Sequence, residues 1–203
     1  MRVDVPLKDV PVLSIKDFYK VNDFEKEKLI EKILDSKVAH DNHPKSQGTQ
    51  SNFEILYDYN DHLKNLYQKF FNVSKSIFEP FEVSTKSVTT CWACVTNEDY
   101  YEFVPHNHIR TSTINSVYYL NIPKVNKNLS GPIKFQMNDE WHYYQPENDE
   151  IIIFPNYLVH DATAHKSKEW RISVNMEIIC KKDEDFVSKY LDKTGRIVYN
   201  EIK

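Results

Sequence analysis

The sequence has no long hydrophobic run. No segment of the 203 residues approaches the roughly 18 consecutive apolar residues that a helix needs to cross a bilayer. Residues 1–6 also lack the apolar core of a secretory signal. We therefore expect a soluble, cytoplasmic protein with no membrane partner.

Cysteine is scarce, because the chain has only three. An odd number without an export signal favours free thiols in a reducing compartment. Cys91 and Cys94 have the spacing of redox and zinc motifs, but residues 88–96 are rich in β-branched and aromatic types and are typical of a strand. Positions three apart on a strand face opposite sides, and no second cysteine pair is present to complete a zinc site. We expect ordinary core cysteines.

Positive charge is not in excess. The chain has 26 lysines and arginines against 30 acidic residues, and its net charge is -4. Proteins that track phosphates need a basic stripe, so we expect no nucleic-acid partner. Apolar residues make up 40% of the chain and aromatic residues 13%, which is enough for a packed core and excludes wholesale disorder.

The character of the chain changes from helical to extended near residue 80. Before this point, one helix is predicted to begin at Asn22 or Asp23, and a second covers about residues 60–78. After it, short strand-like runs alternate with turn signals, as in a sandwich or barrel. These runs are residues 86–96, 101–109, 113–122, 132–136, 142–145, 150–159 and 170–179.

This order predicts a mainly β (α+β) fold in which N-terminal helices pack outside a jelly roll. We expect one domain over residues 1–203, with a helical part at about 1–80, a core at about 86–180, and a helix and charged tail at 181–203. The prolines in residues 10–15 favour an edge strand there. Residues 40–51 are polar and aperiodic and are expected to form a loop that contacts the substrate.

Two histidines lie two residues apart in an extended segment. His106 and His108 would share one face of a strand, and His160 comes at the end of an apolar run that is typical of a buried strand. Imidazole binds Fe, Zn, Cu and Ni, so three histidines predict a metal site without naming the metal. The alternative for His106 and His160 is a buried histidine bonded within the core. The alternative for His108 is that it lies next to the metal ligands without binding the metal, and that Asp161 or a water completes the metal coordination.

A second group of polar residues follows in the next alternating segment. Arg171 and Ser173 would share one strand face. A buried arginine is costly unless it is paired, and its guanidinium matches a carboxylate in a bidentate way. In residues 115–121, Val117 and Tyr119 point one way and Tyr118 the other. A phenol, a guanidinium and a hydroxyl suit the distal carboxylate of a dicarboxylic acid, whose other end can chelate the metal.

Together these motifs resemble the Fe(II)- and 2-oxoglutarate-dependent oxygenases, and most of all their prolyl-hydroxylase-like group. The resemblance covers about residues 90–178 and rests on the motifs at 106–108, 117–121, 130–135, 154–160 and 171–173. It implies a double-stranded β-helix core with iron at its mouth. It also implies that His106 and His160 bind the iron and that His108 occupies the second ligand position, where Asp or Glu is usual. Arg171 would pair with the distal carboxylate of 2-oxoglutarate, and Tyr119 and Ser173 would hydrogen-bond it.

The resemblance implies a dioxygenase that uses Fe(II), 2-oxoglutarate and O2. Such an enzyme hydroxylates a small-molecule or peptide substrate, for example at a peptidyl proline, and releases succinate and CO2. Two other classes remain open: a cupin-like three-histidine metal dioxygenase that does not use 2-oxoglutarate, and a non-catalytic jelly-roll binding module. Neither class needs the carboxylate-binding pair Arg171 and Ser173.

Overall fold

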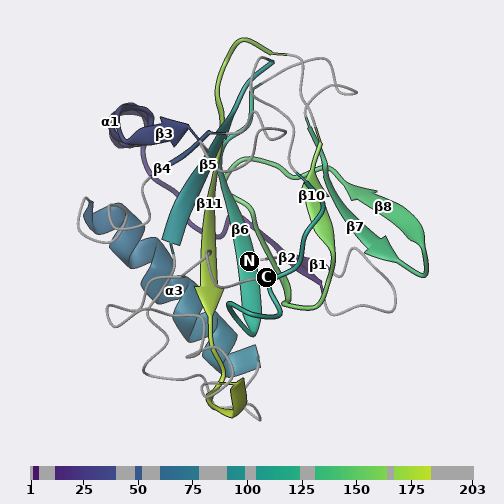
Figure 1. Cartoon of the computed structure of the whole chain (residues 1–203). Helices are drawn as coiled ribbons and strands as arrows, with labels where there is room; N and C mark the ends of the chain where they lie inside the picture. Colours follow the sequence, from purple (N-terminus) through teal and green to yellow (C-terminus); the bar gives the residue numbers. More distant parts are fainter. Residues whose placement is uncertain are drawn as a thin grey trace.

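Two antiparallel sheets and two helices form the described part of the chain (Figure 1). The computed structural model describes residues 2–4, 12–39, 49–51, 60–77, 91–98, 104–123, 131–163 and 167–183. The helices are α1 (Asp23–Asp35) and α3 (Asp61–Ile77). Neither is long and apolar enough to cross a bilayer, and the described residues contain no other helix that is.

The larger sheet has eight strands in the order β1-β2-β9-β6-β11-β5-β4-β3. These strands are β1 (Arg2–Asp4), β2 (Leu13–Lys16), β3 (Lys37–Ala39), β4 (Thr49–Ser51), β5 (Cys91–Thr96), β6 (Ile114–Asn121), β9 (Ile151–Pro155) and β11 (Arg171–Ile178). The smaller sheet has the order β10-β7-β8, with β7 (Ile133–Met137), β8 (Glu140–Tyr144) and β10 (His160–Ala162).

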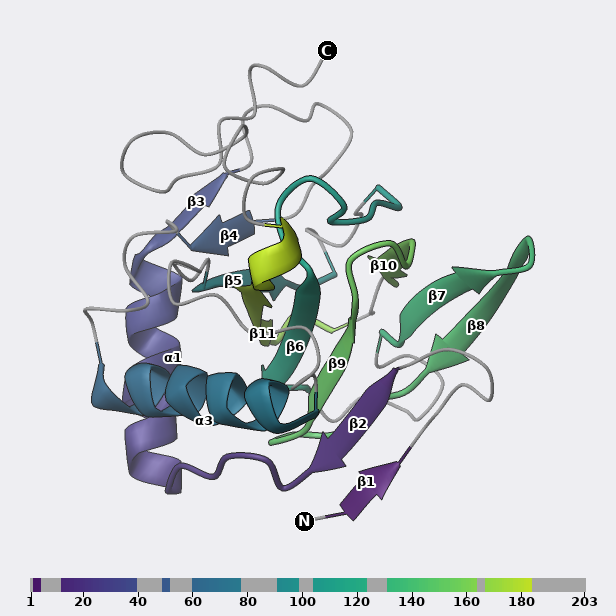
Figure 2. The same cartoon turned by 90° about the horizontal axis from the view of Figure 1, so that it is seen from below.

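The two helices cover one face of the larger sheet, and the smaller sheet lies on the other side (Figure 2). Helix α1 begins where sequence predicts, because the Asn22 side chain accepts a hydrogen bond of 3.0 Å from the backbone N–H of Glu25. Leu29 of α1 and Phe70 of α3 are fully buried against the sheet. The hydrophobic stripes predicted for both helices therefore form the outer core.

Strand β6 divides its side chains between two cores. Tyr118 packs in the outer core under the helices, whereas Val117 and Tyr119 pack in an inner core between the sheets. Phe135 of β7 and Phe154 of β9 complete this inner core, with ring centroids 5.3 Å apart. The predicted alternation along residues 115–121 is thus confirmed.

Strand β11 has the same division, but its inner face is polar. Its even-numbered residues, Ile172 to Ile178, are buried in the outer core. Its odd-numbered residues, Arg171 to Glu177, line a pocket between the sheets. One strand thus anchors the sheet with one face and lines the pocket with the other.

Three of the predicted elements differ from the structure. Residues 10–15 were expected to form an edge strand, but β2 lies between β1 and β9, and β1 is the outermost strand. The predicted strand at 101–109 is not a regular strand over its described residues 104–109, where only His106 forms an isolated bridge. The run 150–159 ends as a strand at Pro155, and a separate short strand begins at His160.

Two further predictions fall partly outside the described residues. Residues 49–51 form strand β4, which pairs with β3 and β5, so the predicted loop at 40–51 is wrong at its C-terminal end; residues 40–48 are not described. In the predicted C-terminal helix and tail, residues 181–183 form one turn of 3-10 helix, and residues 184–203 lie outside the described part.

The outer core predicts the effect of shortening a helix side chain. Phe70→Ala removes a ring that is fully buried between α3 and the sheet, so we expect a loss of about 3–5 kcal/mol in the free energy of unfolding. Phe24→Ala on α1 is the matched control, because its ring is 66% exposed, and its effect should stay below about 1 kcal/mol. Urea denaturation followed by circular dichroism measures both, and equal losses would contradict the assigned core.

Candidate metal and carboxylate site

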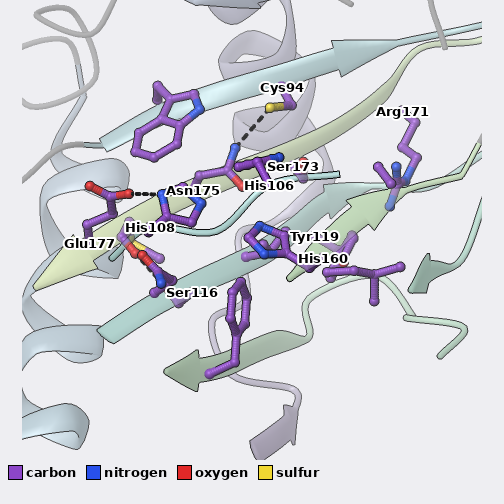
Figure 3. Close-up of a pocket in the computed structure, with 17 residues that line it drawn as sticks. Cys94, His106, His108, Ser116, Tyr119, His160, Arg171, Ser173, Asn175 and Glu177 are labelled. Carbon is purple, nitrogen blue, oxygen red and sulfur yellow. Dashed lines mark hydrogen bonds and ion pairs between the residues drawn. The ribbon is translucent and has the colours of Figure 1, made fainter. Parts of the chain in front are cut away.

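Three imidazoles converge in the pocket between the two sheets (Figure 3). The ring nitrogens of His106, His108 and His160, called here the histidine cluster, lie within 4.8 Å of one another. Their ring centroids are 4.5 to 5.1 Å apart. Within the described residues, no other group of three or more His, Cys, Asp or Glu side chains is arranged in this way. The cluster therefore has the size of a site for one metal ion.

Backbone hydrogen bonds bring the histidines together from distant parts of the chain. The backbone N–H of His106 donates to the backbone carbonyl of His160 (3.1 Å). In return, the backbone N–H of His160 donates to the backbone carbonyl of His106 (2.9 Å). The N–H of His108 donates to the carbonyl of Asn156 (2.8 Å), in the loop between β9 and β10. These bonds clamp the segment 104–109 against the start of β10, although this segment is not itself a regular strand.

Two of the imidazoles are oriented by their own backbone. The Nδ1 atom of His106 lies 2.9 Å from the carbonyl oxygen of Val104, and that of His160 lies 3.0 Å from the carbonyl oxygen of Leu158. A carbonyl only accepts, so Nδ1 carries the proton in both rings. The Nε2 atom of each neutral ring then keeps the lone pair that a metal requires.

His108 is oriented by a carboxylate. Its Nδ1 lies 2.5 Å from Oε1 of Glu177, a side chain of β11 that is only 3% exposed. The Thr111 hydroxyl also approaches Oε1, at 3.4 Å, and the N–H of Thr111 donates to the His108 carbonyl at 3.0 Å. His108 thus presents Nε2 to the cluster as the other two rings do. Glu177 was missed in the sequence, although its place on the face of Arg171 and Ser173 was a usable signal.

The cluster has a buried side and an open side. His160 is 7% exposed, whereas His106 is exposed to solvent. Burial, followed by the neighbouring His106 and His108, lowers the pKa of His160 well below its ordinary value, so this ring stays neutral and able to bind a metal. Phe154 packs edge to face on His160, with centroids 4.6 Å apart. Access to a bound ion would therefore be from the side of His106.

Asp161 is not part of the cluster. It follows His160 on β10 and so faces the opposite side of the strand. Its carboxylate pairs with Lys134 of β7 at 3.1 Å. The alternative in which Asp161 completes the coordination in place of His108 therefore disagrees with the structure.

The guanidinium of Arg171 lies in the same pocket, beyond Ser173 along β11 (Figure 3). Arg171 is 3% exposed, and its Nε atom has no hydrogen-bond partner. Within the described residues, no carboxylate lies within ion-pair distance of it. Its guanidinium carbon is 5.3 Å from the centroid of the Tyr119 ring. A buried cation without an anion is costly, so this end of the pocket is suited to an anionic ligand.

Two hydroxyls complete this end of the pocket. Burial raises the pKa of the Tyr119 phenol, so the phenol stays protonated and able to donate. Ser173, only 6% exposed, pairs with Tyr119 across β11 and β6. Arg171, Tyr119 and Ser173, called here the carboxylate cradle, thus line one pocket with the histidine cluster. The structure brings all six residues singled out in the sequence to this pocket.

The side chain of Cys94 lies in a different environment from the one that the sequence predicts. Cys91 is buried in the outer core as expected, but Cys94 is only partly buried and lines the pocket. The Asn175 side chain donates a hydrogen bond of 3.1 Å to its sulfur. Burial raises the pKa of the Cys94 thiol, so the sulfur remains a neutral wall of the pocket. The prediction that the cysteines face opposite sides of a strand is correct, but the inner side is a pocket rather than packed core.

Comparison with known proteins gives a family match over part of the chain. Residues 90–177 match the sequence profile of a family described as "Putative 2OG-Fe(II) oxygenase". This part of the chain therefore resembles the 2OG-Fe(II) oxygenases, as the sequence motifs predict. The match supports an oxygenase, and the matched segment contains the histidine cluster and the carboxylate cradle. No curated protein matches the sequence.

Solved structures of 2OG oxygenases share the fold. A prolyl-4-hydroxylase from Pseudomonas putida is 10% identical, with a TM-score of 0.64 over 85% of this chain and 94% of that one. A prolyl hydroxylase from Trichoplax adhaerens, in complex with a hypoxia inducible factor peptide, is 12% identical, with a TM-score of 0.61 over 87% of each chain. The non-heme alpha ketoglutarate dependent epimerase SnoN of nogalamycin biosynthesis is 10% identical, with a TM-score of 0.62 over 84% of this chain and 78% of that one. The expected double-stranded β-helix core is confirmed.

The guanidinium of Arg171, which has no carboxylate partner among the residues that the structure describes, predicts a stability effect in the protein without ligands. Arg171→Met replaces a buried charge by an apolar side chain of similar length, so we expect the free energy of unfolding to rise by about 1–4 kcal/mol. Lys64→Met, at an exposed position of α3, is the control and should change it by less than about 0.5 kcal/mol. Urea denaturation of metal-free protein measures both. Destabilisation by Arg171→Met would show that the guanidinium is already satisfied by the protein.

Proposed function

We propose that the chain is a non-haem Fe(II)- and 2-oxoglutarate-dependent dioxygenase that hydroxylates a peptide or small-molecule substrate. The reaction would consume O2 and release succinate and CO2. The observation that carries this proposal is the buried guanidinium of Arg171, which has no carboxylate partner among the described residues and shares a pocket with the histidine cluster. A metal site alone fits many activities, but a metal site with an adjacent carboxylate cradle fits few.

The histidine cluster fits iron. Its three imidazoles would bind through Nε2, because each Nδ1 faces an oxygen acceptor. Imidazole is a suitable ligand for Fe(II), and three protein ligands on one side of the ion leave positions open for a chelating keto acid and for O2. Bound iron would supply the activation of O2 and the oxidation of a C–H bond.

The carboxylate cradle fits the other end of 2-oxoglutarate. Arg171 would bind the distal carboxylate in a bidentate way, and the hydroxyls of Tyr119 and Ser173 would donate to it. The chain itself would thus hold the cosubstrate in one orientation, with its keto-acid end toward the histidine cluster. Two aromatic side chains form walls next to the cluster. The Phe154 ring centroid lies 4.6 Å from that of His160, and the Trp92 ring centroid lies 6.3 Å from that of His108. Such walls keep water away from the reacting groups.

The substrate would enter beside His106, which is the exposed member of the cluster. A peptide substrate is supported by the structural similarity to prolyl hydroxylases, one of which is solved with a bound peptide. A small molecule is supported by the similarity to SnoN, which is solved with Fe3+, alpha ketoglutarate and nogalamycin RO. A peptidyl proline is the first substrate to test.

Two other functions compete with this proposal. A cupin-like three-histidine dioxygenase would bind a metal and not use 2-oxoglutarate, and a jelly-roll binding module would need neither. Neither function gives a reason to bury Arg171 without a carboxylate partner among the described residues. The buried guanidinium therefore favours the 2-oxoglutarate-dependent reaction.

An anaerobic titration tests the proposal. Addition of Fe(II) and 2-oxoglutarate to the metal-free protein should produce the weak visible charge-transfer band of an iron-bound keto acid. Arg171→Ala should retain Fe(II) but bind 2-oxoglutarate more weakly by about 2–5 kcal/mol, roughly 30-fold or more. His160→Ala should lose the band because it lacks one of the iron ligands.

The control variant is Lys64→Ala, which removes an exposed cation on α3 and should leave the titration unchanged. Admission of O2 should then give succinate in the wild-type protein and in this control. A wild-type protein that binds Fe(II) but shows no band with 2-oxoglutarate would favour the cupin-like function. A protein that binds neither would favour the binding module.

A further inference from the structure

The carboxyl group of Glu177 is buried directly behind the histidine cluster (Figure 3). Glu177 is 3% exposed, and its Oε1 lies 2.5 Å from Nδ1 of His108. His108 turns its other ring nitrogen toward the cluster, so its imidazole lies between the carboxylate and the position of a bound ion. Glu177 can therefore affect a bound metal ion electronically through the imidazole ring of His108.

The cluster itself provides no negative charge. Three neutral imidazoles leave a bound dication with its full charge of about +2 in a partly buried pocket, where charge is poorly screened. Within the described residues, the carboxyl group of Glu177 contacts the cluster, with Oε1 at 2.5 Å from Nδ1 of His108. An ionised carboxylate at this place would lower the total charge of the metal ion, its three imidazoles and the carboxylate by one, and it would not occupy a coordination position of the metal.

The contacts of Glu150, a second buried carboxylate, differ from the contact of Glu177 with the histidine cluster. Glu150 is also fully buried, but its carboxylate accepts hydrogen bonds from the hydroxyls of Ser14 and Tyr144 and from the backbone N–H of Glu147. These bonds join β2, β8 and β9, so Glu150 has a structural role. Glu177 instead faces the ring of His108 and the more distant Thr111 hydroxyl. Its carboxylate is therefore placed to act on the histidine cluster.

We propose that Glu177 is a positioning residue that fixes the Nδ1 proton of His108 and supplies, through this imidazole, the negative charge that three neutral ligands lack. This inference rests on the proposed function, because it takes the histidine cluster to be the iron site. A ring that shares its Nδ1 proton with a carboxylate is a stronger donor at Nε2. Glu177 therefore strengthens Fe(II) binding and lowers the Fe(III)/Fe(II) potential.

Measurements of metal affinity separate the effect of the Glu177 charge from the effect of its hydrogen bond to His108. Glu177→Gln retains an oxygen that can accept the His108 Nδ1 proton but removes the charge, and we expect Co(II) and Fe(II) affinities to fall by about 10-fold to 100-fold. The matched control is Glu140→Gln, which removes a carboxylate from an exposed position of β8 and should leave both affinities unchanged. Anaerobic competition with a chromophoric chelator measures these affinities.

The redox potential gives a readout that a purely structural role would not change. The Fe(III)/Fe(II) potential of Glu177→Gln should be higher than that of wild-type protein and of Glu140→Gln, because loss of a negative charge favours the less oxidised ion. Thermal unfolding of the metal-free variants checks that they fold. If Glu177→Gln does not fold, the pair Glu177→Asp and Glu177→Asn replaces it, because these side chains match in size and differ in charge. The aspartate variant should then bind the metals more tightly than the asparagine variant.

The results separate this inference from the proposed function. Wild-type affinity and potential in Glu177→Gln, or equal affinities in the aspartate and asparagine variants, would overturn the role of Glu177 and leave the oxygenase proposal intact. A wild-type protein that binds Fe(II) but not 2-oxoglutarate would overturn the oxygenase proposal, and the same variants would still test Glu177. Absence of metal binding in wild-type protein would overturn both.

Discussion

The site depends on the division of strand β11 into an apolar face and a polar face. Its apolar face, from Ile172 to Ile178, is buried under the helices and fixes the strand in the centre of the larger sheet. Because a strand alternates its side chains, the same packing forces Arg171, Ser173 and Glu177 toward the inner pocket. Arg171 then lies at the carboxylate end and Glu177 behind His108 at the metal end. The outer core thus supplies the rigidity that a site of this kind requires.

Much of this arrangement could be predicted from local pattern. The period of the apolar residues identified α1, α3 and the long strands β6 and β11, since their buried faces dominate their sequences. The six candidate site residues were also identifiable. The histidines stood out by the spacing of His106 and His108 and by the place of His160 after an apolar run, and Arg171 by the cost of burying a guanidinium without a partner. Tyr119 and Ser173 followed from the strand faces that they share with the site. The resemblance to the oxygenases added the order in which these motifs occur, and the comparisons confirm the fold and support the resemblance.

Other features depend on contacts between distant residues, which periodicity does not report. Residues 101–109 were expected to form a strand, but the described part, 104–109, is held by two backbone hydrogen bonds to His160 and one to Asn156. The edge position given to residues 10–15 was wrong because β1 adds outside β2. The contact of Glu177 with His108 was missed, and Cys94 was expected in the core, because both positions depend on the pairing of β11 with β5 and β6 and on the loop that carries His108. Each of these contacts joins residues that are far apart in the chain, and this is what made them invisible to local pattern.

The most direct test of the site is an anaerobic crystal structure of the protein with Fe(II) and 2-oxoglutarate. We expect one iron bound by the Nε2 atoms of His106, His108 and His160, with the keto-acid end of 2-oxoglutarate on the iron and its distal carboxylate paired with Arg171. Iron bound through Nδ1 of these rings, or a 2-oxoglutarate carboxylate away from Arg171, would contradict the site.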